Sequence, residues 1–400
     1  MRTVVAIFGA LAAMAPPLPV LAAGEGDLKI PFTKATLANG MVVILSEDHA
    51  VPQIAVNVSY NVGSRMEHPG RTGFAHLFEH LMFMGTHRAP AKAFDAWMEG
   101  AGGHNNAWTA EDRTDYFDIA PPTALPLLLW LEADRMRDLG PLIDQEKLDL
   151  QREVVRNERR QSIENRPYGI EELELPKLLW PETHPYHHPV IGSHEDLEAA
   201  TVADVKQFFA TWYDPSNASL VVAGDFDPQG ARELVDRWWG GIPSDRKPTE
   251  PGVAGFTDPH TTLAGVVRET VSDNVELAKV TIAWQAPRHF APGDAELDLI
   301  ASVLSNGKAS RLYKSLVYEQ KIAQSISAAQ QSHVLASEFV IEATVRPGIE
   351  PARVEKSVFD QLAKLRTQEV TSEELERARN EYEMSFIDHL QGVPARASLL

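Results

Sequence analysis

The feature that most constrains the fold is the segment GFAHLFEHLMFMG, in which three polar side chains interrupt an apolar run. Residues four apart lie on one face of an α-helix, so His76 and His80 share a face, and Glu79 projects beside them. The other residues are apolar nearly all round the helix: Phe74, Leu77, Phe78, Leu81, Met82 and Phe83. The sequence therefore predicts a buried helix that brings one carboxylate and two imidazoles together.

A buried carboxylate is costly unless a cation or hydrogen bonds compensate its charge. Zinc would supply that compensation, because two imidazoles and a carboxylate suit it and leave one position open for water. Glu79 would then take a proton from that water. The alternative is that His76 and His80 are ordinary core histidines and Glu79 pairs with an arginine. The complete His-x-x-Glu-His spacing favours the metal.

Composition limits the classes of function. The first residues, MRTVVAIFGALAAMAPPLPVLAAGEG, have one early cation, an apolar stretch and small residues, which predicts a signal peptide over residues 1–23. We therefore expect a secreted protein, periplasmic in a Gram-negative host, with no later membrane span. The chain has no cysteine, which excludes disulfides and thiolate metal sites. A formal net charge of -19 argues against nucleic-acid binding and is compatible with peptide substrates.

The order of strand and helix patterns predicts two repeats. We expect a metal-binding repeat over residues 28–245, a linker rich in proline, glycine and threonine over 246–264, and a second, non-metal-binding repeat over 265–400. The predicted fold class is α+β, with two homologous α/β-roll repeats, each a mainly antiparallel sheet covered by helices. The second repeat is expected to be truncated at its C-terminus, because the first has about eighty more residues after its long helix.

Local patterns predict individual elements in both repeats. The strands are expected at 36–46, as a hairpin around Asn39-Gly40, and at 53–62, 106–119, 218–224 and 279–284. Helices are expected at 92–99, 145–162 and 294–305. Two more are expected to begin at a threonine: one runs from an N-cap at Thr123 to residue 137, and the other starts at Thr201.

Four motifs carry a family resemblance: HLFEH, GGHNNAWTAEDRTDYF, REVVRNE and YDPSNASLVVAGDF. Together they closely resemble the pitrilysin/insulinase family of inverzincin metallopeptidases, in its bacterial processing-peptidase-like subgroup. The resemblance implies one zinc ion per chain, with His76 and His80 as ligands and Glu79 as the catalytic base. It also implies a third ligand at Glu158; Glu153 is the rival, and the family register favours Glu158.

Further residues are identified only through this resemblance. Asn106 and Ala107 match a substrate-contacting turn into an edge strand, on which an extended peptide would add as a further strand; without the resemblance they form an ordinary edge strand. Gln151 stands where relatives have an acidic residue close to the site. Its amide can still hydrogen-bond a ligand histidine or the substrate, but it adds no negative charge.

One departure from the family predicts a partner. Active relatives commonly have an arginine and, seven residues later, a tyrosine that hold the substrate carbonyl, and the matching positions here are Val317 and Gln324. Nearby Arg311, Tyr313 and Tyr318 are out of register and are expected to be packing or surface residues. We therefore expect a second half-molecule, either a C-terminal continuation or a separate subunit, to supply the pair.

The function expected from these features is a secreted zinc endopeptidase acting on peptides or unfolded polypeptide segments. A non-catalytic structural or assembly subunit of the same family is the first alternative, and a metallohydrolase of non-peptide amides is the second. A histidine cluster in THPYHHP, with His184, His187 and His188, could mark a second metal site, although its prolines favour an extended loop.

Overall fold

The computed structural model describes residues 29–244, 263 and 265–400, and residues 32–400 form one compact unit. The predicted signal peptide lies outside the described residues, as does nearly all of the predicted linker. Within the part of the chain that is described, no helix is both long enough and apolar enough to span a bilayer.

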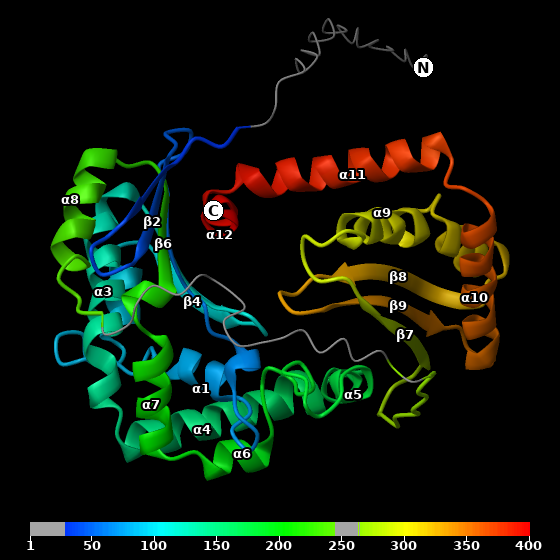
Figure 1. Cartoon of the computed structure of the whole chain (residues 1–400), viewed down its shortest axis with the longest axis horizontal. Coiled ribbons are helices and arrows are strands. Elements are labelled where there is room, and N and C mark those ends of the chain that lie inside the picture. Colours follow the sequence, from blue (N-terminus) through cyan, green and yellow to red (C-terminus); the bar gives the residue numbers. More distant parts are fainter. Residues whose placement is uncertain (1–28, 245–262, 264) are drawn as a thin grey trace, which may run out of the picture. The chain divides into compact units, whose positions relative to one another are not determined.

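The first sheet has six strands in the order β1-β2-β6-β3-β5-β4 (Figure 1). Neighbouring strands are antiparallel except β2 and β6, which are parallel. This arrangement makes β4 an edge strand of the sheet. The strands are β1 (Thr33–Thr36), β2 (Val42–Glu47), β3 (Ile54–Tyr60), β4 (His104–Thr109), β5 (Thr114–Ala120) and β6 (Ala218–Gly224).

Apolar residues occupy both faces of this sheet. Along β3, Val56 and Val58 belong to the large core, whereas Ala55 belongs to a smaller cluster, as the two-residue period of a strand requires. Helices cover the face with the large core and contribute Leu77, Leu128, Phe208 and Val235 among others. A sheet buried on both faces reads as nearly continuous apolar sequence, as in the SLVVAG segment of β6.

The helices that follow the first strands include the site-bearing pair α1 and α4, which pack against each other. Asp144 caps α4, and Thr201 caps α7 in a capping box. The helices of this part are α1 (Phe74–Leu81), α2 (Ala93–Gly100), α3 (Leu125–Leu142), α4 (Gln145–Arg159), α5 (Ile170–Leu179), α6 (His194–Ala199), α7 (Val202–Trp212) and α8 (Pro228–Trp238).

The second sheet repeats part of this pattern with three antiparallel strands in the order β7-β9-β8. Helix α9 follows β7 as α1 follows β3, which is the repetition expected from the sequence. The α+β repeat architecture is therefore confirmed. The elements are β7 (Lys279–Ala286), β8 (Ala323–Gln331), β9 (Ser337–Val345), α9 (Asp294–Ser305), α10 (Pro351–Thr367), α11 (Ser372–Gln391) and α12 (Val393–Leu399).

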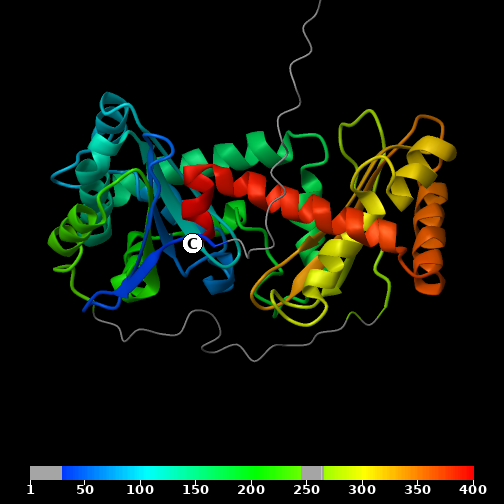
Figure 2. The ribbon, with the colours of Figure 1, turned by 90° about the horizontal axis from the view of Figure 1, so that it is seen from above.

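Helix α12 returns to the first sheet and covers the face opposite the large core (Figure 2). Val393 and Ala397 of α12 pack in one buried cluster with residues of β2, β3, β5 and β6. The cluster's other buried members are Ile44, Ala55, Ile119, Val221 and Ala223. The last helix of the chain thus completes the burial of the first sheet.

Two local predictions were wrong. The expected strand at 106–119 is a hairpin of β4 and β5, because Ala110 and Glu111 turn to accept hydrogen bonds from the backbone N–H groups of Ser64 and Arg65. Thr123 does not cap a helix; it lies inside a short 3-10 turn, and α3 begins at Leu125. The other predicted elements are present, with ends that differ by a few residues.

Candidate metal centre

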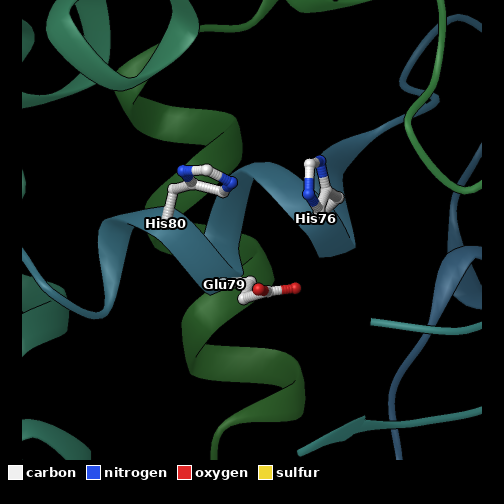
Figure 3. Close-up of side chains that lie close together, drawn as sticks. All are labelled: His76, Glu79 and His80. Atoms are coloured by element: carbon white, nitrogen blue, oxygen red, sulfur yellow. The ribbon is translucent and has the colours of Figure 1, made fainter. Parts of the chain in front are cut away.

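Helix α1 brings together the three polar residues that interrupt its apolar sequence. One potential ligand atom from each of His76, Glu79 and His80 lies within 4.8 Å of the others (Figure 3). The rings of the two histidines meet edge to face, with 4.8 Å between their centroids. The apolar side chains of Leu77, Phe78 and Leu81 are buried in the core, and this packing fixes the direction of the polar face.

Helix α4 adds a carboxylate to this group. Glu158 Oε2 lies 3.1 Å from His80 Nε2, and its Oε1 lies 3.7 Å from His76 Nε2. Glu153 instead pairs with Arg156 at 2.8 Å and is 62% exposed. The structure therefore brings Glu158 to the histidines and leaves Glu153 on the helix surface.

Burial and neighbouring charges set the protonation of the group. Burial, reinforced by the charge of His80, lowers the pKa of His76 from 6.5 to about 4, so this imidazole is neutral at pH 7 and can coordinate a cation. Burial raises the pKa of Glu79, opposed by a hydrogen bond from Thr109. A hydrogen bond with His80 lowers the pKa of Glu158. Two imidazoles and an ionised carboxylate with converging donor atoms fit the ligand preferences of zinc.

Thr109, at the end of β4, was not identified from the sequence. Its hydroxyl donates to Glu79 Oε2 over 2.5 Å. The two residues are thirty positions apart, so no local pattern connects them. The one available signal was a threonine within the strand at 106–119, which was expected to lie beside the metal.

Strand β4 also carries Asn106 and Ala107. They pair with Phe117 and Tyr116 of β5, and the described residues place no strand on the other side of β4. Asn106 is exposed, and Ala107 is partly buried. The open edge beside α1 has the geometry expected for strand addition.

Gln151 lies elsewhere. Its amide nitrogen is 2.8 Å from Met84 Sδ, and the structure shows no hydrogen bond from Gln151 to the two histidines or to Glu158. Of the two bonds open to this amide, the one to a ligand histidine is not formed between the described residues, and the one to a substrate stays a prediction.

The histidine cluster of THPYHHP forms separate contacts. His184 stacks on Trp180 with ring centroids 4.4 Å apart, and His187 Nδ1 lies 2.7 Å from the Trp180 carbonyl oxygen. His188 Nδ1 lies 3.6 Å from Glu67. Among the described residues, the α1 triplet is the one group with metal-binding spacing, so this cluster gives no second site.

Val317 and Gln324 stand where active relatives were expected to have an arginine and a tyrosine. Val317 is buried in the core of the second sheet, and Gln324 is exposed on β8. Arg311 forms an ion pair with Glu374, and Tyr318 is 73% exposed. These residues thus have the packing and surface locations that the sequence predicted.

Comparison with known proteins places this geometry in a family. Residues 42–181 match the model described as Insulinase (Peptidase family M16), and residues 199–382 match the one described as Peptidase M16 inactive domain. The chain is 30% identical to zinc protease PqqE of Helicobacter pylori, over 89% of this chain and 79% of that protein. It is 23% identical to the uncharacterized zinc protease YmxG of Bacillus subtilis, over 91% of this chain and 85% of that protein.

Solved structures agree with the sequence comparison. A protease from Helicobacter pylori superposes with a TM-score of 0.84 at 29% identity, covering 92% of this chain and 88% of that one. The periplasmic protease PqqL from Escherichia coli gives a TM-score of 0.70 at 18% identity, and the match covers 92% of this chain but 41% of PqqL. From these matches and the α1 motif, we conclude that the chain belongs to peptidase family M16, the insulinase family.

Proposed function

We propose that this chain is a secreted zinc endopeptidase that hydrolyses peptides or unfolded polypeptide segments. The observation that carries the proposal is the convergence of Glu158 on His76 and His80, with Glu79 beside them. Relatives that bear the name zinc protease support a peptidase role. The signal-peptide pattern of residues 1–23 supports secretion, and periplasmic localisation in a Gram-negative host is part of the proposal.

His76, His80 and Glu158 would hold one zinc ion per chain. When bound, that ion would polarise the substrate carbonyl and make a water molecule acidic enough to attack it. The neutral state of His76 at pH 7 supports this role, because a protonated imidazole cannot be a ligand.

Glu79 is the general base of the proposed reaction. The Thr109 hydroxyl holds one of its carboxylate oxygens, which orients the other toward the site and stabilises the ionised form. Glu79 would then pass the proton taken from water to the leaving amine. It would thus act as general base in the first half of the reaction and as general acid in the second half.

Strand β4 is the proposed binding site for the substrate backbone. An extended peptide would pair with its open edge near Asn106 and Ala107, which favours unfolded segments because a folded protein rarely offers a free strand. Main-chain pairing gives affinity with little dependence on side chains. The site would therefore accept many sequences.

A second half-molecule is the proposed partner. Val317 has no polar group to replace the arginine, and Gln324 has an amide in place of the tyrosine phenol. The match to PqqL covers less than half of that protein. We infer that a C-terminal continuation or a separate subunit supplies these groups. Peptide hydrolysis by this chain alone, equal to that in the presence of the partner, would refute the inference.

Replacing the base tests the enzymatic role. We expect wild type and Glu79→Gln to bind one zinc ion each, and peptide hydrolysis to fall by at least about 100-fold in the variant. Glu153→Gln, at an exposed glutamate of α4, is the matched control and should retain full activity. A zinc-free wild type, or a wild type as inactive as Glu79→Gln with its partner present, would favour the structural-subunit role.

A further inference from the structure

The N-terminus of the metal-binding helix α1 has no cap of its own. Gly73 occupies the N-cap position with a φ of 86°, and no side-chain hydrogen bond is made from that position. A Cβ on Gly73 would lie 2.6 Å from the Ile191 carbonyl oxygen. A capping side chain such as serine or aspartate therefore cannot be accommodated there, and the first N–H groups of the helix need another acceptor.

Glu67, six residues upstream, supplies that acceptor. Its Oε2 accepts a hydrogen bond from Gly73 N at 2.8 Å, and its Oε1 accepts one from Ala75 N at 2.7 Å. The side chain is fully buried, with 0% of it exposed. Burial raises the pKa of Glu67 well above its usual range, and the hydrogen bonds from the backbone N–H groups of Ala75 and Gly73 oppose that rise. The helix dipole also favours the ionised form.

The position of His76, the next residue after Ala75, depends on this end of the helix. The ring nitrogen of a metal-binding histidine that faces away from the metal usually donates to an acceptor that fixes the ring. His76 Nδ1 is buried and has no hydrogen-bond partner among the described residues. The direction of its Nε2 is thus set by the helix backbone and by packing.

The same end of α1 is linked to α4. Gly192 approaches so closely that a Cβ on it would lie 2.4 Å from Gly73 Cα, and the Gly192 carbonyl oxygen accepts a hydrogen bond from Arg159. Arg159 follows Glu158 directly in the sequence. A shift at the start of α1 would therefore change the distance between His76 and Glu158.

We propose that Glu67 is a positioning residue that raises zinc affinity by fixing the first turn of α1, and with it His76. The proposal rests on the zinc site proposed above. Glu67 does not touch the site itself; it acts through the backbone N–H groups of Gly73 and Ala75. Loss of a partner that hydrogen-bonds a metal ligand directly typically changes metal affinity by roughly 10–100-fold, and we expect an effect of the same order from Glu67.

Glu67→Gln is the direct test, because it keeps the size of the side chain and replaces one accepting oxygen with a donor. That donor would face a backbone N–H, so one of the two hydrogen bonds is lost. We expect the zinc dissociation constant, measured by competition with a chromogenic chelator, to rise by roughly 10–100-fold. Asp227→Asn is the matched control: Asp227 caps α8 by accepting from Gly230 N, and α8 carries no site residue. Its zinc affinity should equal that of wild type.

A second readout separates positioning from a loss of stability. Cobalt(II) in place of zinc gives visible ligand-field bands that depend on coordination geometry, and we expect these bands to change in Glu67→Gln at temperatures where circular dichroism shows a folded protein. If Glu67→Gln does not fold, Glu67→Asp decides the question, because it keeps the charge but withdraws the carboxylate by one methylene. An intermediate loss of zinc affinity is expected for this variant.

The outcomes distinguish the inference from the proposed function. A wild type that binds no zinc overturns the proposed metal site itself. A wild type that binds zinc, with folded Glu67→Gln or Glu67→Asp binding it equally well and giving the same cobalt spectrum, refutes the role of Glu67 and leaves the metal site standing.

Discussion

The hydrogen bond from Thr109 to Glu79 makes a quantitative prediction about catalysis. Thr109→Val keeps the shape of the side chain and the backbone of β4 but removes the hydroxyl that donates to Glu79 Oε2 over 2.5 Å. A hydrogen bond to an ionised group contributes about 1.5–3 kcal/mol. Because each 1.36 kcal/mol of activation free energy changes the rate tenfold, kcat should fall by about 10–150-fold in the variant.

The value of KM should change by less than about threefold, because β4 offers a substrate the same backbone groups in the variant. Thr109→Ser retains a hydroxyl and should recover most of the lost rate. The assay is cleavage of an internally quenched unstructured peptide, in the preparation that hydrolyses it, with zinc content measured in parallel. A Thr109→Val protein with full zinc content and a kcat within about twofold of wild type would falsify the assignment of Thr109 as the residue that holds the base.

Three further changes test other parts of the structure. Glu158→Gln should weaken zinc binding by more than about 100-fold in chelator competition, whereas Glu153→Gln should leave it unchanged; equal affinities would exclude Glu158 as a ligand. A hydrogen bond from Arg311 lowers the pKa of Glu374 to about 2, so the ion pair stabilises the fold above about pH 4.5 and the contribution is lost as the pH falls toward 2. Urea unfolding of Glu374→Gln should show a loss of about 1–2 kcal/mol at pH 7 and a smaller loss at pH 3; the reverse order would contradict the ion pair. Gly192→Ala places a Cβ 2.4 Å from Gly73 Cα at a φ of 72°, and should lower the melting temperature far more than Gly348→Ala, which has a φ of 77° but no atom within 4 Å of the new Cβ. Equal shifts in melting temperature would show that the contact between the two loops relaxes freely.

The parts of the fold that the sequence predicted are those set by local patterns. The spacing of His76 and His80 is enough to place both on one face of a helix, since one turn fixes their relation. The helix start at Thr201 and the hairpin at Asn39-Gly40 were likewise predicted from a few adjacent residues. Glu158 needed more than a pattern, because its position depends on how α4 packs against α1.

The parts that were missed depend on contacts between distant residues. Thr109 reaches Glu79 only because β4 lies at the edge of the sheet next to α1. Glu67 caps a helix from outside it, and the usual capping pattern places the acceptor within the helix's own first residues. The turn at Ala110 forms because the backbone of Ser64 and Arg65 binds it, and a strand pattern through 106–119 does not reveal that partner.

The location of α12 has a consequence for how this protein can be divided. Val393 and Ala397 shield apolar side chains of β2, β3, β5 and β6 that would otherwise face water. A shortened chain ending at residue 245 would retain every proposed zinc ligand yet carry an unshielded apolar surface, which promotes aggregation. The last helix therefore belongs to the fold that holds the proposed zinc ligands, although it lies more than 200 residues after them in the sequence.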